Sequence, residues 1–111
     1  MFLTGTYTLS HARWDYFAND EPEALGVTQE QAAELCEAVD AGWERAVQHA
    51  GREFGLELKV EWVDAGASHC LKMDSDGFPL TNVVEVSIWV ALEQATDHVT
   101  GEWGKQHFPT G

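Results

Sequence analysis

Histidine and cysteine side chains are the groups in this chain best suited to binding a metal ion or acting as a nucleophile. The five histidines and two cysteines are His11, Cys36, His49, His69, Cys70, His98 and His107. No two of them have the separation of about two to four residues that zinc ligands typically show. No Gly-x-Ser-x-Gly sequence is present to place a serine nucleophile on a sharp turn. We therefore expect no metal centre, no cofactor and no enzymatic activity.

A series of carboxylates suggests a different chemistry, the electrostatic binding of a basic surface. Its members are Glu30, Glu34, Glu37, Asp40 and Glu44. Successive members are three or four residues apart, so each lies beside the next on one face of a helix. At about 1.5 Å per residue the series spans about 21 Å. Its linear charge density is therefore of the same order as that of a nucleic acid strand, which carries a phosphate about every 3.4 Å.

A solvated helix face is the simpler interpretation of these carboxylates, because runs of charge usually are solvated. Acidic residues near the start of a helix also complement its dipole. That effect fades beyond the first turn, so it does not account for Glu37, Asp40 and Glu44. Repulsion along the series costs a helix about 1–2 kcal/mol, and no basic residue lies within the series to offset it. We therefore keep a partner-binding face as the functional hypothesis.

The whole chain shares the acid excess. Nineteen Asp and Glu residues stand against six Lys and Arg among 111 residues, which gives a formal net charge of −13. Such a protein is repelled by phosphate backbones and anionic lipid and attracted by basic partners. We expect no direct binding of nucleic acid and no membrane association. Solubility or adaptation to high salt would also explain the acid excess.

The sequence shows neither a membrane-spanning segment nor a secretory signal. No apolar run approaches the roughly 20 residues needed to span a bilayer. The N-terminus lacks a basic region followed by an apolar stretch. We therefore expect a cytoplasmic protein with reduced cysteines, folded as a single domain over residues 1–111.

The clearest predicted element is a long amphipathic helix over residues 28–54, whose apolar residues recur at helical spacing on one face. Thr28 and Gln31 have the spacing of a capping box at its start. Gly55 follows the last periodic apolar residue and suits the C-terminal cap. Two internal glycines each cost about 1 kcal/mol relative to alanine. They are Gly42 and Gly51.

Alternating apolar and polar residues predict strands before and after that helix. The predicted strands are residues 2–10, 56–62, 68–73 and 84–92, with a further candidate at 99–103. We assign 84–92 to a strand because its apolar residues would lie all round a helix. A short helix over 11–18 and turns at 64–66 and 74–77 connect these elements. The predicted fold class is α+β, with one long amphipathic helix packed on a small antiparallel sheet of three to five strands.

Trp89 is the aromatic residue that we single out as a contact site. In a strand over 84–92 it would oppose the apolar face, and aromatic residues are enriched at the energetic centres of protein interfaces. Packing under the long helix or between protomers is the alternative role for this side chain.

These observations favour a non-enzymatic acidic protein that inhibits a partner by occupying its basic, nucleic-acid-binding surface. In charge and size alone the chain resembles small phage or bacterial accessory proteins of the immunity or anti-defence type. One alternative is a structural or assembly subunit that forms homo-oligomers through a sheet edge and exposed tryptophans. Another is a small ligand-binding domain or enzyme with a pocket between helix and sheet.

Overall fold

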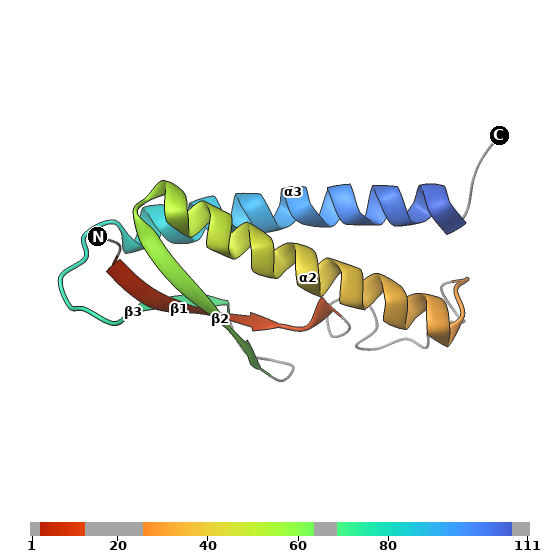
Figure 1. Cartoon of the computed structure of the whole chain (residues 1–111), viewed down its shortest axis with the longest axis horizontal. Helices are drawn as coiled ribbons and strands as arrows, with labels where there is room; N and C mark the ends of the chain where they lie inside the picture. The colour runs from red at the N-terminus through yellow and green to blue at the C-terminus, as the bar shows by residue number, and fades with distance from the viewer. Residues whose placement is uncertain (1–2, 13–25, 64–68, 108–111) are drawn as a thin grey trace.

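A computed structural model describes residues 3–12, 26–63 and 69–107 of the chain. Its elements, in order, are β1 (Leu3–Ser10), α2 (Gln29–Glu53), β2 (Leu56–Val63), β3 (Cys70–Met73) and α3 (Thr81–His107). Figure 1 shows both helices on the same side of the sheet, where they lie side by side. The described residues thus form two layers, and the α+β class expected from the sequence is confirmed. The expectation of one long helix was wrong, because two long helices, α2 and α3, cover the sheet.

The sheet is mixed, with the strand order β2-β1-β3. The central strand β1 pairs in parallel with β2, from Leu3 opposite Leu56 to Ser10 opposite Val63. It pairs antiparallel with β3, where Gly5 lies opposite Met73. The expectation of an antiparallel sheet was therefore wrong for the β1–β2 pair. Parallel neighbours need a long crossover connection, and α2 is long enough to provide it.

Helix α2 begins and ends as its sequence predicts. The Gln31 backbone N–H donates to the Thr28 hydroxyl over 3.0 Å, and the Thr28 N–H donates to the Gln31 side chain over 2.9 Å. These two bonds form the predicted capping box. At the other end Gly55 has a φ of +75°, a value that favours glycine.

Both internal glycines of α2 lie where other elements approach the helix closely. A methyl group at Gly51 would lie 2.7 Å from the Leu58 Cδ1 atom of β2. One at Gly42 would lie 3.0 Å from a Val99 methyl carbon of α3. These glycines therefore allow α2 to pack against β2 and α3, which offsets their poor helix propensity.

The predicted strands at 84–92 and 99–103 are wrong, because both segments belong to α3. The apolar residues of 84–92 do lie all round this helix, but they form two faces. Val84, Ile88 and Leu92 are four residues apart and buried in the core. The opposite face carries Val86 and Val90, which are exposed. The alternation that suggested a strand is thus the overlap of a buried and an exposed helical stripe.

The core lies between the helices and the inner face of the sheet. Its fully buried large side chains are Tyr7, Leu9, Val39, Val47, Leu56, Val84 and Ile88. Helix α3 is joined to the sheet by the Leu71 N–H, which donates to Glu85 Oε1 over 3.3 Å. Neither described helix is long and apolar enough to cross a membrane.

The segments that connect the helices and strands can be compared with the sequence predictions only where the structure describes them. The predicted turn at 74–77 is confirmed, and Gly77 has a φ of +88°. The predicted turn at 64–66 and residues 13–18 of the predicted helix at 11–18 fall outside the described residues.

Candidate protein-binding surface

The predicted carboxylate series lies on α2, but its members differ in exposure. Glu30, Glu34 and Glu37 are exposed, whereas Asp40 and Glu44 are half-buried. No Lys or Arg within the described residues lies within 4.0 Å of any of the five carboxylates. The helical arrangement is therefore as expected, and binding of a partner by this face stays a prediction.

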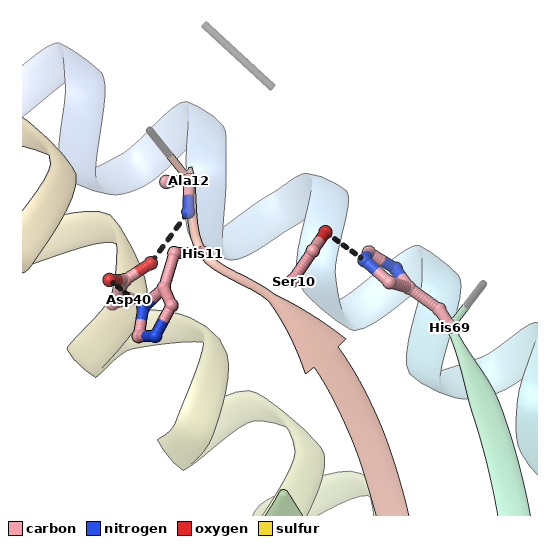
Figure 2. A network of polar contacts seen from close by, with 5 residues as sticks. All are labelled: Ser10, His11, Ala12, Asp40 and His69. Atoms are coloured by element: carbon pink, nitrogen blue, oxygen red, sulfur yellow. Dashed lines mark hydrogen bonds and ion pairs between the residues drawn. The ribbon is translucent and has the colours of Figure 1, made fainter. Parts of the chain in front are cut away.

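Asp40 has a structural role that the sequence analysis missed. Its Oδ1 accepts the Ala12 N–H over 2.8 Å, and its Oδ2 lies 2.9 Å from His11 Nδ1 (Figure 2). The His11 ring also stacks on Trp62 of β2, with ring centroids 4.6 Å apart. Both carboxylate oxygens are thus engaged in holding the residues after β1 against α2.

Glu34 turns toward a different neighbour. Its Oε1 lies 3.3 Å from His107 Nε2, at the C-terminal end of α3. The His107 ring stacks on Trp103 with centroids 4.4 Å apart. Glu34 and Asp40 therefore reach different elements, so the carboxylate series does not point as a whole toward one partner.

The polar network in Figure 2 does not form a Ser–His–Asp relay among the described residues. Ser10 Oγ lies 3.3 Å from His69 Nε2, whereas Asp40 pairs with His11 on the other side of the chain. Ser10 is also buried, with 5% of its surface exposed. A catalytic triad needs one imidazole to contact both the hydroxyl and the carboxylate. The described residues also contain no group of three or more His, Cys, Asp or Glu side chains placed to hold a metal ion.

The most unusual surface of the described residues lies on α3. Val83, Val86, Trp89 and Val90 form what we call the α3 outer face, and they are 50%, 60%, 54% and 49% exposed. Valine is a poor helix former, and solvated helix faces normally carry polar side chains. Local helix formation therefore does not account for this stripe, and exposed apolar patches commonly mark interaction sites.

Trp89 stands between two hollows of the surface. The smaller, of about 180 Å³, is lined by Asn82, Glu85, Val86 and Trp89. The larger, of about 380 Å³, has walls that include Trp43, His69, Trp89, Glu93, Thr96 and Asp97. We call the larger one the Trp89 cavity. It combines aromatic rings from α2 and α3, a histidine next to β3 and two carboxylates of α3.

Hydrogen bonds fix one wall of the Trp89 cavity. The Trp43 indole N–H donates to the Thr96 hydroxyl over 2.8 Å, and that hydroxyl donates to the Leu92 carbonyl over 2.9 Å. The His69 ring meets Trp43 edge-on, with centroids 6.1 Å apart. The Trp43 ring is therefore held in place from two sides.

The Tyr7 hydroxyl, which interacts with the Trp89 side chain, is buried and makes no hydrogen bond of normal geometry within the described residues. Burial raises the pKa of Tyr7 to about 12, against the opposing effect of the nearby Trp89 indole N–H, while the charge of Glu85 raises it further. Tyr7 therefore stays neutral well above physiological pH.

Sequence reasoning proposed Trp89 as a contact residue, which stays a prediction, and wrongly assigned it to a strand. It missed the α3 outer face and the Trp89 cavity. The sequence did contain a signal for the α3 outer face. A helix with apolar residues all round needs a partner on the face that the core does not cover. The cavity joins distant segments and has no local sequence pattern. The function of this surface must be argued from its own residues, because comparisons with protein-family models, curated proteins and solved structures find no match.

Proposed function

We propose that this chain is a non-enzymatic acidic binding protein that docks on a basic protein partner through the α3 outer face. The observation that carries the proposal is the exposed apolar stripe on α3, a helix whose opposite face is already buried in the core. Trp89 lies between two hollows and is the natural anchor. Tryptophans in such central positions often contribute most of the binding energy of an interface.

The charge of the chain favours a basic partner over a second copy. Two copies with a formal net charge of −13 each repel one another as they approach. The stripe also continues along α3 into two exposed carboxylates, Glu93 and Asp97, one and two turns after Trp89. A partner with an apolar patch bordered by Lys or Arg would complement both features, and the acidic field would speed its association.

The partner surface in this proposal is one that binds nucleic acid, and the effect is inhibition by occlusion. Surfaces that bind phosphate backbones are basic, and so they attract a strongly acidic protein. The exposed carboxylates of α2, Glu30 and Glu37 among them, support this part of the proposal as a source of steering charge.

Affinity capture from the source cells with matched variants tests the proposal. The wild type and a Leu3→Ser control should capture the same basic protein, and a Val86→Ser/Trp89→Ala variant should lose it. Leu3 is the control because it is also an exposed large apolar residue, 44% exposed, but lies on β1. With the purified partner, the dissociation constant should rise steeply between about 50 and 300 mM salt, as for charge-assisted docking.

Two results would contradict the proposal. One is retention of the captured protein by the α3 double variant together with its loss in the Leu3 control. The other is light scattering that shows a stable dimer of the wild type and a monomer of the α3 double variant. The second result would favour the assembly-subunit alternative, in which two α3 outer faces cover each other.

A further inference from the structure

We infer that the Trp89 cavity is a pocket for an arginine side chain of the partner. This inference rests on the proposed function, because the docked partner protein is what would carry the arginine. The cavity has about 380 Å³ and opens beside the α3 outer face. Ligand pockets typically span about 300–1,000 Å³. A pocket near the lower limit suits one side chain rather than a large cofactor.

The aromatic walls suit a flat cation. Trp89 contributes an exposed indole ring, Trp43 contributes part of a second indole that is only 5% exposed, and His69 contributes a third ring. Tryptophan has the most favourable ring face for a cation, and guanidinium stacks on it more readily than ammonium does because it is planar and weakly hydrated. The indole N–H of Trp43 already donates to Thr96, so this wall presents its ring rather than a donor.

The rim of the cavity supplies opposite charge. Glu93 and Asp97 are four residues apart on α3, line the cavity and are exposed. No Lys, Arg or His among the described residues lies within 4.0 Å of either carboxylate. A guanidinium group carries five N–H donors in a planar fork, which allows it to bond both carboxylates while its face rests on a ring.

Other ligand classes fit these walls less well. A phosphate or carboxylate would be repelled by Glu93 and Asp97. A neutral apolar group would desolvate the carboxylates without pairing them, which is unfavourable. Lysine would pair with the carboxylates as a point charge but would gain less from the rings.

A titration with a minimal arginine probe tests the pocket without the partner. N-acetyl-arginine methylamide is added to ¹⁵N-labelled full-length protein at pH 8. The indole N–H resonances of Trp43 and Trp89 should shift saturably, with a dissociation constant on the order of millimolar. The matching lysine probe should bind more weakly, and the neutral isostere citrulline should bind at least about tenfold more weakly than arginine.

Charge-neutral variants provide the control. Glu93→Gln/Asp97→Asn should weaken arginine binding about tenfold and leave citrulline binding unchanged. Glu57→Gln/Glu61→Gln also removes two negative charges, but from exposed positions on β2, and should leave arginine binding unchanged. Absence of a saturable shift at both indoles, equal binding of citrulline, or an equal loss in both double variants would each overturn the inference.

The inference and the proposed function can fail separately. A Val83→Ser/Val86→Ser variant should lose the partner protein but still bind the arginine probe, because neither valine lines the Trp89 cavity. If the wild type docks through the α3 outer face but does not bind the probe, the pocket inference alone is wrong. If the probe binds but α3 variants retain the partner, the docking proposal alone is wrong.

Discussion

Asp40 shows how one carboxylate on a predicted binding face can be used for folding instead. Its two oxygens hold His11 and the Ala12 N–H, and only 20% of its side chain is exposed. Sequence spacing placed it correctly beside its neighbours on α2. The spacing could not reveal that the residues after β1 pass close to that point of the helix.

We predict that Asp40→Ala lowers the free energy of unfolding by about 1–3 kcal/mol, because the Ala12 N–H then loses its acceptor in a half-buried position. Glu37→Ala, on the same helix but exposed, should change it by less than about 0.5 kcal/mol. Urea denaturation of the three proteins measures both values. Equal stability of the two variants would contradict the structural role of Asp40.

Tyr7 gives a prediction for alkaline pH. Its folded-state pKa is raised to about 12, above the ordinary tyrosine pKa of about 10. The folded protein therefore keeps this proton where the unfolded chain has lost it. The stabilising contribution is complete below pH ~10 and falls by about 1.4 kcal/mol per pH unit as the pH rises toward ~12.

Tyr7→Phe removes that titration. At pH 7–9 the variant should be as stable as the wild type or slightly more so, because the buried hydroxyl lacks a hydrogen bond of normal geometry within the described residues. Between pH 10 and 11 the wild type should lose more stability than the variant. Urea unfolding at pH 9, 10 and 11 compares the slopes, and parallel slopes would show that Tyr7 titrates normally.

At the scale of elements, α2 was predictable and α3 was not. A capping box, a one-sided apolar stripe and a terminal glycine agree along α2, so local and long-range forces favour the same structure. In α3 the apolar residues serve both the core and the α3 outer face, which imitates the alternation of a strand. The carboxylate series and Trp89 were visible in the sequence. The Trp89 cavity was not, because Trp43 and His69 reach it only through tertiary packing.

Glycine substitutions test the packing of the helices. Gly51→Ala should reduce stability, because overpacking against Leu58 costs about 1–3 kcal/mol and outweighs a gain in helix propensity of about 1 kcal/mol. Gly101→Ala on α3 meets nothing within 4 Å and should increase stability by about 0.5–1 kcal/mol. Thermal unfolding of both variants gives the signs, and a stabilising Gly51→Ala would contradict the close contact with β2.

For the whole molecule, charge and shape act together. The Cα radius of gyration is 15.7 Å, compared with about 13 Å for a typical globular chain of this length. An elongated form separates like charges, yet a formal net charge of −13 still opposes folding. Net repulsion of this kind weakens as salt screens the charges.

We therefore predict that the melting temperature rises between about 20 and 200 mM NaCl. A screening gain of about 1 kcal/mol would correspond to roughly 4–8 °C for a small domain. Scanning calorimetry at several salt concentrations measures the change. A melting temperature that falls with salt would mean that local ion pairs such as Glu102–Lys105 outweigh the overall repulsion.

The central position of β1 has a consequence during synthesis on the ribosome. Both neighbours of this strand are made later, since the β2 and β3 partners lie more than fifty residues further along the chain. Tyr7 and Leu9 thus emerge long before the segments that will shield them, and such distant pairings form slowly. Until Met73 emerges, β1 lacks one or both of the strands that hydrogen-bond to it, and its apolar side chains stay uncovered. A chaperone would protect the nascent chain most during this interval.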